Sequence, residues 1–372
     1  MGVALCGPIQ LESLQNPTGE TAGEAWLFSD DERLYLTWIE KSKTASTVYF
    51  SSYDGTAWLP KKTIVSSDRL FVNWADFPKA AVNGRQLMAV WPEMIGEGHG
   101  YGLKYRLSEN MGEQWGPIQW LHEDLSGVEY GFVSLVPRNQ GFYAIWLDAR
   151  AMGEDHSGDM QLRGRSIDAK KLGPEVQIDA STCDCCSTAL MAMDDQLLAV
   201  YRDKTPAQIR DISLSRLKSD KWSAAGTLGK DNWTFHGCPV NGPAMDVRGK
   251  RAAIAWYTGA EPARTQVALY DGEKIGEPLV VSRDSKGRVD VVWLNDDHLL
   301  VTHMKLGQPI FSAALVSTKP KLSLITDQEL DHLPAGRLAG FPQLARFKQR
   351  VFVVWLGGEP SGLRFAELKI TP

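Results

Sequence analysis

Phe142-Tyr143-Ala144-Ile145-Trp146 is the clearest copy of a short apolar strand that ends in an aromatic residue. Strands of this kind recur along the chain, and repeats of about 40 to 50 residues indicate propellers or solenoids. Seven copies occur, at residues 34–38, 87–91, 142–146, 197–201, 252–256, 299–302 and 351–355. Seven copies predict seven blades, and we expect their aromatic ends to pack in the core.

The residues around each copy complete a blade of four strands. A short strand entered through Gly or Pro comes before most copies, as at 131–135, and an alternating strand follows, as at 103–107. A fourth strand often opens with Gly-Pro or Glu-Pro, as at 116–120 and 277–281. This pattern is typical of an antiparallel propeller blade. We therefore predict an all-β chain in which residues 1–372 form one seven-bladed β-propeller, with six blades as the alternative.

The last blade lacks its fourth strand, since the sequence ends just after Lys369-Ile370. The missing strand is found at the other end of the chain, because Gly7-Pro8-Ile9-Gln10-Leu11 closely matches Gly116-Pro117-Ile118-Gln119-Trp120. Closure of this kind hides both free edges of the end blade. We predict that the N-terminal strand closes the ring.

Composition limits the possible partners. A hydrophobic content of 43% with 23% charged residues is ordinary for a soluble protein with a large core. A net charge of −5 without a long basic run gives no support for binding nucleic acid or an anionic membrane. No window approaches the ~20 apolar residues of a transmembrane helix. We expect a monomer whose partner is a small molecule, a glycan or a metal ion.

Turns between the third and fourth strands carry a motif of their own. Ser52-Tyr53-Asp54-Gly55-Thr56-Ala57-Trp58 and residues 108–115 are the better copies, with weaker ones at 215–222 and 270–272. The motif resembles the Asp-box, or BNR repeat, of the sialidase superfamily, in which Asp caps backbone N–H groups and Gly takes a left-handed conformation. Sialidases of this type usually have six blades, so seven is a departure.

Four of the five cysteines fall in two segments, residues 182–188 and 233–239. Loops that join the fourth strand of one blade to the first strand of the next open on the same propeller face as the loops between second and third strands. Cys183, Cys185 and Cys186 lie in the loop entering the fourth blade, and His236 and Cys238 in the loop entering the fifth. We therefore expect both clusters to meet at the mouth of the central channel.

Three interpretations of these cysteines stay open. Cys238 could form a disulfide with one of the three, or Cys183 with Cys186, or Cys185 with Cys186, in an oxidising compartment. The four thiolates and the His236 imidazole are also soft ligands suited to Cu(I) or Zn(II). Thiol redox chemistry is the third interpretation, although no thioredoxin-like setting is present.

The resemblance implies an enzymatic hypothesis. Sialidases hold a substrate carboxylate with three arginines, and use a Tyr nucleophile and an Asp acid. An arginine suits this task because its planar fork matches a carboxylate. The early F/Y-R-I-P motif of the family has no match here, so the candidates rest on their place at the rim. They are Asp76 as acid, Tyr257 as nucleophile, and Arg150, Arg202, Arg264 and Arg288 as carboxylate ligands; Glu93, His99, Asp148, Asp155, His156, Arg210, His303 and Met304 share the rim.

The N-terminal segment bears on localisation. Residues 1–7 are too short for a signal peptide. They resemble a trimmed lipoprotein signal ending at Cys6, and the alternative is an ordinary unpaired cysteine. From the family and the cysteine density we expect a periplasmic or extracellular protein. The predicted function is a sialidase-like propeller with a Cys-rich ligand or metal site, and the alternative is an exo-acting sialidase-type hydrolase.

Overall fold

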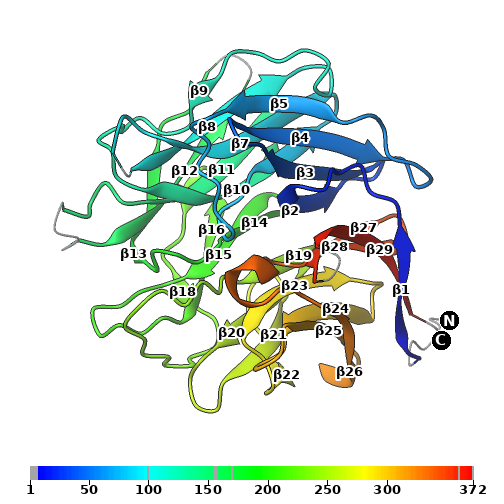
Figure 1. The fold of residues 1–372 in the computed structure, drawn as a ribbon. Coiled ribbons are helices and arrows are strands. Elements are labelled where there is room, and N and C mark those ends of the chain that lie inside the picture. Colours follow the sequence, from blue (N-terminus) through cyan, green and yellow to red (C-terminus); the bar gives the residue numbers. More distant parts are fainter. Residues whose placement is uncertain (1–6, 99, 154–157, 169–170, 359–360, 371–372) are drawn as a thin grey trace.

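The computed structural model describes residues 7–98, 100–153, 158–168, 171–358 and 361–370. These residues form seven antiparallel sheets around a common centre, and each sheet is one blade (Figure 1). Six sheets have four strands and one has five. The predicted seven-bladed all-β propeller is confirmed, and the six-bladed alternative is wrong. The described helical residues, such as the 3₁₀ helix η1 (Gly336–Ala339), include no segment with the length and hydropathy of a membrane span.

The strands follow one another blade by blade along the chain. The first blade holds β2 (Ala22–Ser29), β3 (Leu34–Lys41), β4 (Ser46–Tyr53) and β5 (Lys62–Ser67). The second holds β6 (Lys79–Asn83), β7 (Gln86–Met94), β8 (Tyr101–Ser108) and β9 (Gln119–Trp120). The third holds β10 (Tyr130–Arg138), β11 (Gly141–Asp148), β12 (Met160–Ile167) and β13 (Val176–Thr182).

The fourth blade has an outer edge made of two short strands. It holds β14 (Ala189–Met193), β15 (Gln196–Arg202), β16 (Ile212–Lys218), β17 (Lys221–Trp222) and β18 (Gly226–Thr227). The fifth holds β19 (Ala244–Arg248), β20 (Arg251–Thr258), β21 (Arg264–Tyr270) and β22 (Leu279–Ser282). The sixth holds β23 (Gly287–Trp293), β24 (His298–Met304), β25 (Ile310–Ser317) and β26 (Ser323–His332).

The seventh blade joins both ends of the described chain. It consists of β27 (Gln343–Phe347), β28 (Arg350–Gly357), β29 (Gly362–Ile370) and β1 (Ile9–Leu14). Strand β1 pairs antiparallel with β29, with Ile9 opposite Ile370 (Figure 1). The side chain of Gln328 on β26 also receives a hydrogen bond from Ile9 N (3.0 Å) and donates one to Ile9 O (2.7 Å). The predicted closure is confirmed, while Cys6 lies outside the described residues.

Neighbouring blades are tied together near the centre of the ring by buried carboxylates. Asp76 Oδ1 accepts a hydrogen bond from Phe132 N of the next blade (2.9 Å). Asp290 Oδ2 does the same for Leu344 N (2.7 Å), and Asp246 Oδ2 for Trp293 N (2.7 Å). The first strand of each blade has a strand on only one side, so some of its backbone N–H groups need another acceptor. The three carboxylates supply it.

The predicted aromatic row is buried, and the tryptophans in it form hydrogen bonds with carboxylates. Trp146 is fully buried, and its indole Nε1 donates to Asp148 Oδ2 (2.9 Å), which in turn binds Arg150 (2.8 Å from Asp148 Oδ1 to Arg150 Nε). The same Trp–carboxylate–cation cluster recurs in four other blades, as Trp38–Glu40–Lys61, Trp91–Glu93–Lys104, Trp256–Asp231–Arg264 and Trp355–Asp331–Arg364. A buried indole N–H needs an acceptor, and the buried acceptor carboxylate needs a cation.

The turn after β4 shows how the repeated motif works locally. Asp54 Oδ1 accepts hydrogen bonds from Thr56 N (2.8 Å) and Ala57 N (3.0 Å). Gly55 has a φ of 106°, which favours glycine. The Trp58 ring packs against Tyr53 and against Phe365 of the seventh blade. The turn therefore joins the first blade to the last.

Candidate functional site

The loop between β13 and β14 brings three thiols together. The Sγ atoms of Cys183, Cys185 and Cys186 all lie within 4.8 Å of one another. Cys183 and Cys186 are almost fully buried, at 1% and 2% exposure, and Cys185 is half-buried. Three soft donor atoms with no more separation than this are suited to a single thiophilic ion.

Backbone and side-chain contacts from neighbouring blades fix the loop that carries these thiols. Cys183 N donates to Arg202 O at the end of β15 (3.0 Å). Asn241 N, in the loop entering the fifth blade, points at Cys186 Sγ (3.4 Å). Thr188 Oγ1 donates to Phe132 O of the third blade (2.9 Å). The thiols are thus held on a rigid part of the fold, between three blades.

The apolar surroundings of Cys185 place the cluster at the channel mouth. Its side chain packs against a hydrophobic cluster that includes Phe132, and Trp74, Val240 and Phe341 pack against the same cluster. These four residues come from the entering loops, or the start of the first strand, of the second, third, fifth and seventh blades. Loops of four blades therefore contribute to the cluster on which Cys185 packs, and the meeting of the cysteines with His236 and Cys238 stays a prediction.

The three thiols have unequal acidity. Hydrogen bonds from Cys185 and Cys186, and then the positive charges of Arg202 and Arg210, hold the pKa of Cys183 well below its usual value despite burial. The pKa of Cys185 is raised, because its thiol donates to Cys183. Burial raises the pKa of Cys186. The arrangement favours one thiolate, on Cys183, held by its two neighbours.

The disulfide expectation is not met among the described cysteines. Cys183 Sγ and Cys186 Sγ lie 3.4 Å apart, whereas a disulfide bond measures about 2.05 Å. The separation is that of a thiol–thiol hydrogen bond. Cys183, Cys185, Cys186 and Cys238 are all free thiols in this structure.

His236 and Cys238 are both exposed in the loop entering the fifth blade. Among the described residues, the group of donor atoms within 4.8 Å of one another contains the three cysteines and neither of these two. Asn241, three residues beyond Cys238, is the part of this loop that contacts the thiols. Metal binding by His236 and Cys238 stays a prediction.

Arg202 is a buried link between blades. Its Nε and Nη2 donate to Asn241 O (2.9 and 2.7 Å), Nη1 to Arg210 O (2.5 Å), and Nη2 also to Tyr257 O (2.7 Å). Its guanidinium lies 4.8 Å from the centre of the Trp233 ring. The side chain is only 2% exposed. These contacts occupy the donors that the carboxylate-binding hypothesis requires.

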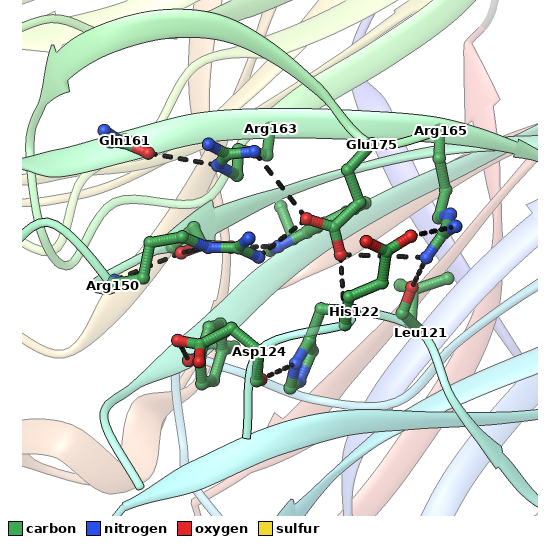
Figure 2. Close-up of polar contacts among 12 residues, drawn as sticks. Leu121, His122, Asp124, Arg150, Gln161, Arg163, Arg165 and Glu175 are labelled. Atoms are coloured by element: carbon green, nitrogen blue, oxygen red, sulfur yellow. Dashed lines mark hydrogen bonds and ion pairs between the residues drawn. The ribbon is translucent and has the colours of Figure 1, made fainter. Parts of the chain in front are cut away.

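Arg150 belongs to a network of ion pairs between the second and third blades (Figure 2). It binds Asp148 and Glu175 (2.8 Å to Glu175 Oε2). Arg163 and Arg165 flank the same buried Glu175 (3.6 and 3.7 Å), as Figure 2 shows. Three arginines do meet here, but the carboxylate they surround is the protein's own.

Arg264 and Arg288 are also engaged. Arg264 binds Asp231 (2.5 Å) and donates to Pro262 O (3.0 Å). Arg288 lies over the Trp74 ring (4.7 Å from ring centre) and donates to Gly340 O (2.8 Å) and Gly336 O (3.1 Å). Each of the four predicted arginines therefore has its own local partners.

Asp76 is almost fully buried, at 2% exposure. Its Oδ1 binds Phe132 N, while Oδ2 is buried with no hydrogen-bond partner among the described residues. Burial raises the pKa of Asp76 to about 7. A Cβ at Gly131 would collide with Oδ2 and lie 3.1 Å from the Tyr101 hydroxyl. Gly131 thus lets the Asp76 carboxyl pack against the backbone, close to the Tyr101 hydroxyl.

Tyr257, the predicted nucleophile, is half-buried against Trp233, with ring centres 5.7 Å apart, and burial raises its pKa. The sequence analysis missed Tyr101, which adjoins Asp76 and stacks on Phe71. The available signal was its place at the start of a third strand, on the same rim as the other candidates. His99, Asp155 and His156 lie outside the described residues.

Comparisons place this architecture among known propellers. No model of a known protein family matches the chain, and no curated protein matches its sequence. Among solved structures it is similar to a subtype N10 neuraminidase-like protein of A/little yellow-shouldered bat/Guatemala/060/2010, at 11% identity and a TM-score of 0.52 over 99% of this chain and 100% of that chain. It is similar to an ulvan lyase of polysaccharide lyase family PL25 bound to -[GlcA(1-4)Rha3S]-, at 9% identity and a TM-score of 0.55 over 98% of this chain and 94% of that chain. Such identities show the fold alone, and in fold the chain is a sialidase-like β-propeller.

Proposed function

We propose that this propeller binds a thiophilic metal ion, Cu(I) or Zn(II), through the thiolates of Cys183, Cys185 and Cys186. The observation that carries the proposal is the group of three Sγ atoms within 4.8 Å of one another in the loop between β13 and β14. With metal–sulfur bonds of about 2.3 Å, sulfur atoms around one ion lie about 3.8 Å apart. The 3.4 Å between Cys183 and Cys186 needs only a small adjustment to reach that separation.

The chemistry of the surroundings supports the same proposal. Cys183 is the thiol poised to ionise first, and ionised sulfur is the form that binds metals. Hydrogen bonds to Arg202 O and from Asn241 N already fix the loop. Ion binding therefore costs little conformational entropy. We extend the proposal to a periplasmic or extracellular location, which stays to be measured by fractionation of cells that make the full-length protein.

The test is metal content combined with matched serine variants. Protein purified under reducing conditions without chelator is titrated with Cu(I) or Zn(II) against a chromogenic chelator. The proposal predicts one ion per chain in the wild type, and loss of that ion in Cys183→Ser and Cys186→Ser. A wild-type chain that takes up neither ion would remove the proposal.

A second candidate is supported by the buried Asp76 and the neighbouring Tyr101. A buried carboxyl with a pKa of about 7 is suited to donate a proton near neutral pH, and Tyr101 shares its space. One structure of similar fold holds a glucuronate-containing glycan. We propose glycan binding or hydrolysis that uses Asp76 as the alternative. Turnover of a fluorogenic sialoside that is lost in Asp76→Asn would favour it, and absence of turnover would leave metal binding as the better account.

A further inference from the structure

We infer that Arg202 and Arg210 tune the three-thiol site toward a monovalent soft cation, Cu(I), over a divalent one. This inference rests on the proposed metal site and concerns the charge that the site prefers. It begins with Arg210, whose side chain is 4% exposed. Arg210 Nη2 donates to Gln208 Oε1 (2.9 Å), but Nε and Nη1 are buried with no hydrogen-bond partner among the described residues.

A buried guanidinium with two unmatched N–H groups is costly unless a nearby anion compensates it. The charges of Arg210 and Arg202 both act on Cys183. Arg202 is also tied to the site through Asn241, whose O accepts from Arg202 and whose N points at Cys186 Sγ. Arg202 is therefore one residue removed from the thiols, and Arg210 adjoins it, because Arg202 Nη1 donates to Arg210 O (2.5 Å).

Charge arithmetic then distinguishes the ions. Asp184 and Lys204, which lie 3.6 Å apart beside the same loop, carry opposite charges that cancel each other. Three thiolates around a monovalent cation carry a net charge of −2, which the two guanidinium groups then balance. Three thiolates around a divalent cation carry −1, so the same pair of arginines leaves an excess positive charge in a buried place. Charge imbalance is unfavourable where water is excluded.

Ligand number points the same way. Structural zinc is almost always held by four ligands in a tetrahedron. Among the described residues, the group within 4.8 Å offers three sulfur donors and no fourth His, Cys, Asp or Glu donor. Three thiolates satisfy Cu(I), a soft ion that accepts trigonal coordination.

The experiment compares the affinities of a monovalent and a divalent ion in charge variants. Cu(I) and Cd(II), the latter as a spectroscopically visible divalent ion, are titrated anaerobically by chelator competition into wild type, Arg210→Gln and Arg210→Lys. Arg210→Gln is expected to weaken Cu(I) binding roughly tenfold more than Cd(II) binding, since the more negative complex loses more attraction. Arg210→Lys, which keeps the charge, should restore most of the ratio.

Two further variants make the result decisive. Arg248→Gln removes a positive charge on the opposite face, where Arg248 pairs with Asp296, and should leave the Cu(I)/Cd(II) ratio unchanged. Asp184→Asn removes a partly exposed negative charge that interacts with Cys183, and should raise the ratio. If melting curves show that Arg210→Gln does not fold, the Asp184→Asn variant is the test instead. An unchanged or lowered Cu(I)/Cd(II) ratio in Asp184→Asn then overturns the inference. An unchanged ratio in a folded Arg210→Gln overturns the inference alone, whereas a wild type that binds neither ion overturns the proposed function with it.

Discussion

Cys183 Sγ and Cys186 Sγ lie 3.4 Å apart as free thiols, three residues apart along a loop that enters the fourth blade. Cys185 Sγ completes the group, within 4.8 Å of both. The pair is too distant for a disulfide and close enough to share a proton or an ion.

Removal of the Asp76 charge should change how stability depends on pH. The pKa of Asp76 is raised to about 7 in the folded protein, from 3.8. The folded state then binds more protons than the unfolded state between these values, so Asp76 lowers stability as pH rises from about 4 to about 7. By about pH 8 the cost is at most ~4 kcal/mol. Asp76→Asn should therefore gain stability relative to wild type between about pH 5 and about pH 8, as measured by urea unfolding.

Asp54→Asn is the control for that measurement, because Asp54 is exposed and its hydrogen bonds lower its pKa to about 2. It should show no gain in relative stability over the same pH interval. The same result for Asp76→Asn would contradict the buried charge assigned to Asp76.

Arg202→Lys should destabilise the junction between the fourth and fifth blades. Lysine cannot reproduce the four hydrogen bonds that Arg202 makes to the carbonyls of Asn241, Arg210 and Tyr257. We expect a loss of about 2–5 kcal/mol in the free energy of unfolding. Arg85→Lys, at an exposed position, should stay close to wild type. Equal denaturation midpoints for the two variants would contradict the role of Arg202.

Glu175→Gln should destabilise the junction between the second and third blades. Glu175 is buried among Arg150, Arg163 and Arg165, so neutralising it leaves buried positive charge without compensation (Figure 2). The expected loss is about 3–5 kcal/mol. Glu123→Gln is a matched control in the same network, because Glu123 is exposed and pairs only at the edge; its cost should be within about 1 kcal/mol. Similar losses for both would show that the burial of Glu175 is not what matters.

Ile9→Ala should weaken the closure of the ring. Ile9 is buried on β1 and packs in the core shared by the sixth and seventh blades, whereas Gln10 beside it is exposed. Ile9→Ala should cost about 2–4 kcal/mol and Gln10→Ala close to nothing. Thermal unfolding followed by circular dichroism measures both, and an equal effect would mean that the N-terminal strand adds little to the core.

The repeat was sufficient to predict the blades, because burial imposes the same apolar pattern on the second strand of each blade. It also predicted the closing strand, because Gly7-Pro8 repeats the Gly116-Pro117 opening. It was also sufficient to bring Cys183, Cys185 and Cys186 together, since they share one short loop. The repeat did not predict the roles of the arginines. Arg150 and Arg264 form ion pairs with carboxylates that accept hydrogen bonds from buried tryptophans. Asp231 and Arg264 lie far apart along the chain, so their pairing could not be predicted from neighbouring residues.

Other features depend on backbone atoms that a sequence does not display. Arg202 binds the carbonyls of Arg210 and Asn241 in two loops and of Tyr257 on strand β20, and no side-chain pattern marks them. The exposure of Cys238 follows from the path of its loop, in which Asn241 is the residue that reaches Cys186. Whether Cys238 joins the three thiols in binding a metal stays a prediction.

The most direct test of the central claim is a Cu(I) titration of the reduced wild type, Cys186→Ser and Cys238→Ser, followed by chelator competition. The account predicts one tightly held Cu(I) per chain in the wild type and in Cys238→Ser, and loss of that ion in Cys186→Ser. Equal Cu(I) retention by Cys186→Ser and the wild type would contradict it.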